Sequence, residues 1–193
     1  MIEGNHETQK NRFISICKSE IKRDGIDALL KWLESSDFYT APASTKYHGA
    51  YAGGLLEHSL NVYDELHRLM KAYPEIETTD ETLAIISLFH DLCKVNFYKP
   101  DTRNVKINGV WQAVPCYSIE EKFVFGGHGS KSVFLCQNFI KLTPEEGTAI
   151  NCHMSCWNGD TKVGGSYEQY PLAWLLHVAD ESATFVLECK DRQ

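Results

Sequence analysis

Apolar residues recur at helical spacing along most of the chain. Two such segments stand near the start, over 11–22 and 26–34, and Asp24-Gly25 between them is a helix stop signal. A third segment, 55–73, turns His58 toward the same side as its leucines and ends before Pro74. The pattern predicts packing helices here. The stretch 36–54, aromatic and rich in small residues without periodicity, is expected to be an ordered loop.

The most apolar of the predicted helices covers 81–95 and contains His90, Asp91 and Lys94. An ionised carboxylate inside such a helix costs on the order of several kcal/mol unless it is paired or bound to a metal. Arginine is scarce in the predicted helices, so we expect a bound cation to be the partner of Asp91. Because neighbouring helical positions point about 100° apart, further ligands must come from other segments.

The chain changes character after this helix. The segments 104–107 and 110–114 flank Asn108-Gly109, which is the strongest short hairpin signal. A small β-hairpin inserted between helices is therefore predicted. Two interpretations of it remain open: a flap over a site, or a plain excursion in the connection.

Helical patterns return in the last third of the chain. A helix is predicted from Gly126 to Lys141, and Thr143-Pro144-Glu145-Glu146 is a capping box that begins another, with His153 on its inward face. A polar loop is expected over 158–166. The last helix, 171–189, carries Asp180 on its apolar stripe, where a core residue is expected.

Composition narrows the class of protein. A chain of 193 residues with 43% hydrophobic content fits one compact domain, and a net charge of −7 argues against a broad surface for duplex nucleic acid, so any nucleic-acid contact should be local. The start of the chain has no apolar core and no run approaches the length of a membrane span, so we expect a cytoplasmic protein without a membrane partner.

Cysteine usage points the same way. The seven cysteines form no CxxC pair, which is typical of reduced thiols. A zinc site made of Cys152, His153 and Cys156 is the weaker alternative, because no second Cys/His pair stands at finger-like spacing.

The order of the inward histidines and aspartates resembles a known signature. His58, then His90-Asp91, then Asp180 on successive helices is similar to the H…HD…D pattern of the HD-domain metal-dependent phosphohydrolases. His128 and His153 resemble the two further histidines of the two-metal members of that superfamily. The stretches 53–60, 90–94 and 176–180 are especially similar to the HD domain of bacterial 3′–5′ exoribonucleases.

Two features differ from the named relatives. The exoribonucleases carry an OB-type nucleic-acid-binding domain ahead of the HD domain, whereas only predicted helices precede the match here. The Gly-Tyr-Pro motif of the related cyclic-dinucleotide phosphodiesterases is absent from this chain.

The resemblance implies a fold and a ligand set. The fold is an all-α HD-domain helical bundle with a small inserted β-hairpin over 38–193, preceded by packing helices over 1–37, in one compact domain. The implied site holds two divalent ions of Mn, Fe, Co, Ni or Zn, with Mg as a further candidate. Asp91 bridges the two ions in this arrangement, and the implied metal ligands are His58, His90, Asp91, His128, His153 and Asp180.

The implied activity is hydrolysis of a phosphoester. Asp91 and Lys94 are the expected catalytic residues, and Lys94, His48 and Lys46 are expected to contact the substrate. That substrate is a phosphorylated small molecule, a nucleotide or a short single-stranded nucleic acid. Two alternatives stay open: a one-metal nucleotidase in which His128 and His153 bind substrate, and a non-catalytic HD protein that binds a nucleotide or a protein partner as a regulator. The intact ligand set favours an enzyme.

Overall fold

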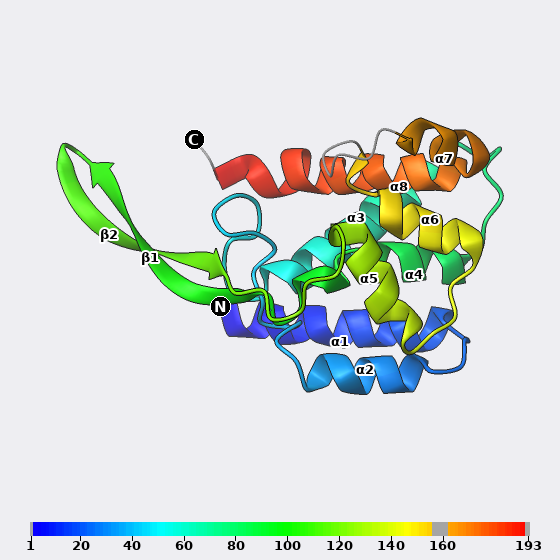
Figure 1. The fold of residues 1–193 in the computed structure, drawn as a ribbon, viewed down its shortest axis with the longest axis horizontal. Helices are drawn as coiled ribbons and strands as arrows, with labels where there is room; N and C mark the ends of the chain where they lie inside the picture. The colour runs from blue at the N-terminus through cyan, green and yellow to red at the C-terminus, as the bar shows by residue number, and fades with distance from the viewer. Residues whose placement is uncertain (1, 156–161, 192–193) are drawn as a thin grey trace.

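The computed structural model describes residues 2–155 and 162–191 of the chain, and Figure 1 shows its elements. The expectation of a mostly helical protein with a two-stranded hairpin is confirmed. Helices form the body of the molecule, and the hairpin extends from one side of it (Figure 1). In chain order the described elements are α1 (Ile2–Glu20), α2 (Ile26–Glu34), α3 (Gly54–Met70), α4 (Asp80–Phe89), η1 (Leu92–Lys94), β1 (Tyr98–Ile107), β2 (Val110–Ile119), α5 (His128–Gln137), α6 (Pro144–Cys152), α7 (Val163–Gln169), α8 (Pro171–Ser182), η3 (Ala183–Leu187) and η4 (Glu188–Asp191).

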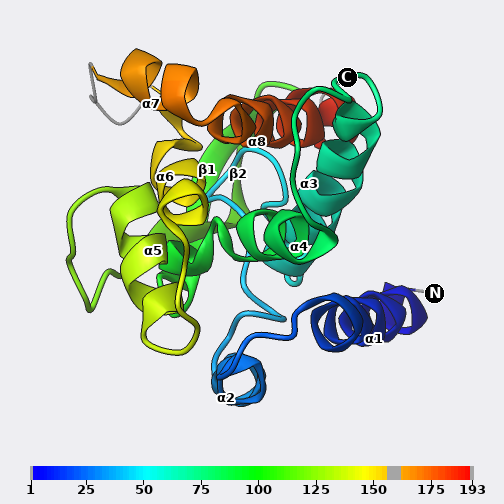
Figure 2. The ribbon, with the colours of Figure 1, turned by 90° about the vertical axis from the view of Figure 1, so that its right-hand side faces the viewer.

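Helix α4 lies in the middle of the body. It contacts α1, α3 and α6, and Figure 2 shows these helices placed around it. Its side chains from Leu83 to Phe89 are all buried, so the prediction of a central buried helix is confirmed.

The predicted end of this helix, at Val95, is wrong. Helix α4 stops at Phe89 with His90 as its C-cap, and the backbone of Asp91 (φ −108°, ψ 22°) leaves the helical region before the short 3₁₀ turn η1. The aspartate side chain competes for local hydrogen bonds and is a poor helix former, in agreement with a break at this position. His90 and Asp91 therefore stand at a helix end, where the geometry differs from that of a continuous helix.

Helix α1 is longer than predicted, beginning at Ile2 rather than near Asn11, because its first two turns are polar and leave no periodic signal. Its Phe13 lies within the main apolar core, with ring centroids 5.1 Å from Phe38 and 6.1 Å from Phe89. The division of the chain at 37/38 stays a prediction.

The hairpin is confirmed and longer than predicted, with ten residues in each strand. Asn108 and Gly109 both have positive φ (51° and 85°), as a type I′ turn requires. Most of its side chains are exposed, and near its base the Tyr117 N–H donates to the carbonyl of Thr45 (3.3 Å). The flap role stays a prediction.

The end of the chain also differs from expectation. The predicted loop over 158–166 is wrong for its last residues, which belong to α7, while 156–161 lie outside the described residues. The predicted last helix changes pitch after Ser182, where η3 is a π-helical segment. Among the described helices, none combines the length and the apolar character needed to cross a membrane. The described cysteines are free thiols.

Candidate metal centre

His58 lies near the start of α3 and is held there by the loop that precedes this helix. The N–H of Leu55 donates to the carbonyl of Ala41 (3.0 Å), and Gly54 packs so closely on Gly49 that an added Cβ would lie 2.0 Å from its carbonyl oxygen. The loop over 36–53 is thus an ordered structure, as predicted, and it fixes the first turn of α3. The imidazole of His58 is 1% exposed and points into the body of the protein.

His90 and Asp91 enter the same space from the end of α4. The Nδ1 of His90 lies 2.7 Å from the carbonyl oxygen of Ser87, which the early helix end leaves free. Nδ1 therefore donates, and the lone pair of Nε2 is directed at the site, 3.2 Å from Nε2 of His58. The Oδ2 of Asp91 lies 3.6 Å from that same His58 nitrogen.

His153 repeats this arrangement at the end of α6. The capping box predicted at Thr143 and Glu146 is present, and α6 ends at Cys152 with His153 as its C-cap. The Nδ1 of His153 donates to the carbonyl of Ile150 (2.6 Å), and its buried Nε2 has no hydrogen-bond partner among the described residues. Its ionic neighbour is Oδ1 of Asp91, at 3.7 Å.

Asp180 completes the cluster from α8. It is 9% exposed, and its Oδ1 lies 3.1 Å from Nε2 of His58. The prediction that a carboxylate occupies a core position of the last helix is confirmed. We call the set His58, His90, Asp91, His153 and Asp180 the core cluster.

The donor atoms of the core cluster have the spacing and chemistry of a metal site. One donor atom each from His58, His90 and Asp91 lie within 4.8 Å of one another, and the same holds for His90, His153 and Asp180. Mixed imidazole and carboxylate ligands suit transition metals. The unpartnered Nε2 of His153 is the strongest single sign, because a buried acceptor without a partner costs about 1–3 kcal/mol unless something binds it.

The core cluster also contains its own balancing charges. Burial lowers the pKa of His58, but hydrogen bonds to Asp180 and Glu188 outweigh burial and raise it to about 10. Burial raises the pKa of Asp91, but the ammonium of Lys94 at 2.6 Å, together with His90 and His153, outweighs burial, so this pKa lies well below its usual range. The prediction that Asp91 needs a metal because no side-chain cation is available is therefore wrong in its reason. Lys94 is that cation.

Other predicted site residues lie apart from the core cluster. His128 begins α5, and its Nδ1 lies 3.4 Å from Sγ of Cys93, which is itself 3.8 Å from Oδ1 of Asp91. His128 belongs to none of the ligand groups formed by the described residues, so its role as a second-metal ligand stays a prediction. Lys46 is exposed, with its ammonium 5.2 Å from the Tyr47 ring centroid. Cys156, the remaining member of the alternative zinc site, lies outside the described residues.

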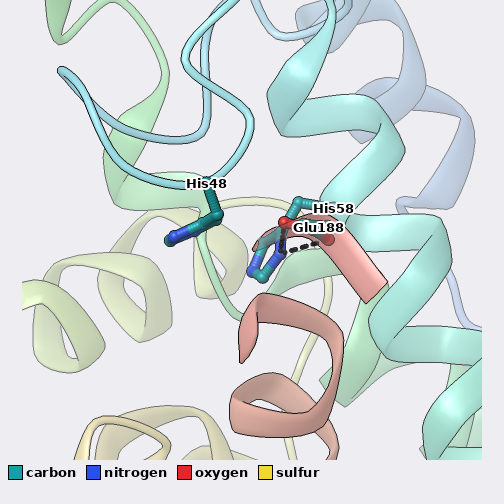
Figure 3. A group of neighbouring side chains, drawn as sticks. All are labelled: His48, His58 and Glu188. Atoms are coloured by element: carbon teal, nitrogen blue, oxygen red, sulfur yellow. Dashed lines mark hydrogen bonds and ion pairs between the residues drawn. The ribbon is translucent and has the colours of Figure 1, made fainter. Parts of the chain in front are cut away.

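His48 lies beside the core cluster. Figure 3 shows it on the loop before α3, and its ring centroid is 4.9 Å from that of His58. Burial, with His58 and Lys94 nearby, lowers the pKa of His48 to about 4, so the ring is neutral near pH 7. Its Nε2 is buried and has no hydrogen-bond partner within the described residues. The position fits the predicted substrate contact, which no observation tests.

Glu188 is the residue that the sequence did not indicate. Its carboxylate lies 3.1 and 3.2 Å from Nδ1 of His58, as Figure 3 shows. It follows the π-helical segment η3, and a π turn holds more residues than an α turn, which is consistent with Glu188 rather than Leu187 facing His58. No sequence pattern marks such a turn.

Comparison with known proteins gives one match. The family model described as HD domain matches residues 55–184, which include every member of the core cluster and leave out Glu188. Curated proteins and solved structures gave no match. These findings support the superfamily and give no evidence for a closer relation to the exoribonuclease HD domains.

Proposed function

The chain belongs to the HD domain family, and from that premise we propose that it is a metal-dependent phosphohydrolase that cleaves a phosphoester of a nucleotide or of a short single-stranded nucleic acid. The observation that carries the proposal is the convergence of the core cluster: buried imidazoles and carboxylates from α3, the end of α4, the end of α6 and α8 meet in one space. The family is generally one of metal-dependent hydrolases.

The residues that would hold a divalent cation are His58, His90, Asp91, His153 and Asp180. They would hold it where it could lower the pKa of a coordinated water and offset the negative charge that develops on a phosphoryl group. His58 must give up its shared proton to become a ligand, because only neutral imidazole binds metal.

The other residues act on the substrate. The ammonium of Lys94 is 2.6 Å from Asp91 and its side chain is 13% exposed, so it can attract a phosphoryl oxygen to the edge of the core cluster. His48 is neutral, and its free Nε2 can form one hydrogen bond with the phosphoester. Burial of the cluster keeps bulk water away and strengthens both interactions.

A one-metal nucleotidase is the second candidate. The position of His128 favours it, because this side chain contacts Cys93 and lies outside the ligand groups of the described residues. His153 lies inside one of those groups, so in this version only His128 is left to bind the substrate. A non-catalytic regulator is the third, and the complete cluster of ligands disfavours it.

The test is a screen of the purified protein with Mn²⁺, Fe²⁺, Co²⁺, Ni²⁺, Zn²⁺ and Mg²⁺ against nucleotides, cyclic dinucleotides and short RNA and DNA, with phosphate or nucleotide release as the readout. The proposal expects hydrolysis that depends on one of these metals and disappears in Asp91→Ala. Metal binding without turnover on any phosphoester would favour the regulator.

A further inference from the structure

We infer that Glu188 is a positioning residue that fixes the imidazole of His58 for metal binding; this rests on the proposed function and deepens it. His58 is contacted on both ring nitrogens, with Asp180 3.1 Å from Nε2 and Glu188 3.1 Å from Nδ1. Nε2 faces the core cluster and Nδ1 faces away from it. Figure 3 shows the carboxylate of Glu188 at the Nδ1 side of the ring.

The three histidines of the core cluster need the same support and obtain it differently. His90 and His153 are C-caps, so each Nδ1 reaches a backbone carbonyl three residues earlier that the helix end leaves free. His58 lies inside α3, where the carbonyls of the preceding turn are already bonded within the helix. An acceptor from elsewhere in the chain is therefore required, and Glu188 is that acceptor.

Glu188 is itself held in place. The side chain of Asn61 donates to its Oε1 (2.9 Å), and Asn61 stands three residues after His58, so both donors lie on one face of α3. The Glu188 side chain is only 4% exposed. The position of this buried carboxylate is therefore fixed by two hydrogen bonds with the same face of α3, one with His58 and one with Asn61.

The local backbone indicates that this position is specific. An uninterrupted α-helix after Ser182 would place Leu187 on the face that carries Asp180, whereas after the π-helical segment η3 it is Glu188 that contacts Nδ1 of His58. Single π turns are often found at functional sites. A carboxylate on Nδ1 holds the proton on that nitrogen, leaves Nε2 for the metal and raises the basicity of the ring, and such partners affect metal affinity by about 10- to 100-fold.

The experiment measures Mn²⁺ and Zn²⁺ binding by isothermal titration calorimetry in the wild type, in Glu188→Gln and in Glu168→Gln. Glu168 is an exposed carboxylate of α7, so its variant is a control for the loss of one negative charge. We expect Glu188→Gln to bind metal at least about 10-fold more weakly, with Glu168→Gln unchanged. Glu188→Asp, which keeps the charge, should recover part of the affinity.

A second variant covers the case in which Glu188→Gln does not fold. Asn61→Ala leaves both His58 and Glu188 in the chain and removes only one support of the carboxylate, and we expect a smaller loss of affinity from it. Metal affinity within twofold of the wild type in the folded variants would overturn the inference, even if their metal-free melting temperatures fell. A wild type that binds no divalent cation would instead overturn the proposed function and this inference with it.

Discussion

The ammonium of Lys94 lies 2.6 Å from Oδ2 of Asp91, so a buried carboxylate of the candidate metal centre is paired with a cation from its own chain. Lys94 is placed there by η1, the single 3₁₀ turn that follows the end of α4. The ammonium favours the ionised form of Asp91 although this carboxylate is buried. Lys94 therefore stabilises the ionised Asp91, and its proposed contact with the substrate would be a second, separable role.

Lys94→Met should separate these roles. In the presence of a chelator, the variant should be less stable than the wild type by about 3 kcal/mol, because removal of one partner leaves the buried Asp91 charge uncompensated. Saturating Mn²⁺ should recover most of that loss, since the cation replaces the ammonium as the partner of Asp91. Urea unfolding with and without Mn²⁺ measures both quantities.

The same variant tests the substrate role. At saturating metal, we expect kcat to fall at least about 10-fold with bound metal unchanged, because an interaction with the phosphoryl group is lost. Lys71→Met, at an exposed lysine beyond α3, is the matched control and should change neither value. Normal kcat in Lys94→Met would exclude a substrate contact.

Asp91→Ala should remove activity and most metal binding while helicity is retained. Asp91 approaches His58, Lys94 and His153 within 3.7 Å, so its carboxylate connects the two ligand groups of the core cluster. Circular dichroism, elemental analysis and turnover measure the three quantities, with the exposed Asp101→Ala as control. Turnover near that of the wild type would rule out the metal mechanism.

His128→Ala and His153→Ala distinguish two ions from one. In the two-ion arrangement predicted from the sequence, His128→Ala lowers bound metal from about two ions per chain to about one. His153→Ala should also reduce metal binding, because the lone pair of its Nε2 has no partner among the described residues and lies 3.7 Å from Oδ1 of Asp91. Elemental analysis after dialysis decides the matter. Unchanged metal content in His128→Ala would contradict the two-ion arrangement and support the one-metal candidate.

Much of the helical fold could be predicted because most helices carry an apolar stripe. The stripes placed α3, α6 and α8, and they turned His58, His153 and Asp180 inward as the structure has them. The turn at Asn108-Gly109 was equally local, since its two positive φ angles depend on those two residues.

What could not be predicted depends on breaks in helical pitch. The stripe through 81–95 does not show that α4 ends at Phe89, yet this end frees the carbonyl that orients His90. In the same way, the π-helical segment exchanges Leu187 for Glu188 with no change in the apolar pattern. The pairing of Asp91 with Lys94 depends on the same break, because both residues belong to the turn that follows the end of α4.

Glu146 provides a prediction about stability that is independent of the metal centre. Its carboxylate is fully buried and accepts from the guanidinium of Arg23 (2.6 and 2.9 Å), from the Thr82 hydroxyl (3.0 Å) and from the Thr143 N–H (2.8 Å). These bonds connect α6 to α4 and to the turn after α1. Glu146→Gln should therefore lower the free energy of unfolding at pH 7 by about 2 kcal/mol, because the buried ion pair is broken.

The effect of Glu146→Gln should depend on pH in a defined direction. Burial raises the pKa of Glu146, but the bonds from Arg23, Thr143 and Thr82 outweigh burial and hold it below its usual value of 4.5. Since the pKa is lower in the folded state than in the unfolded state, the stabilisation is complete above about pH 4.5 and is lost as the pH falls toward the folded-state value.

Urea unfolding at pH 7 and pH 4 should show that the difference in the free energy of unfolding between wild type and Glu146→Gln is smaller at pH 4. Glu145→Gln, one residue earlier in the same helical turn, should show a small difference at both values. A difference for Glu146→Gln that stays constant with pH would mean that the ionised carboxylate is not the source of its stabilisation.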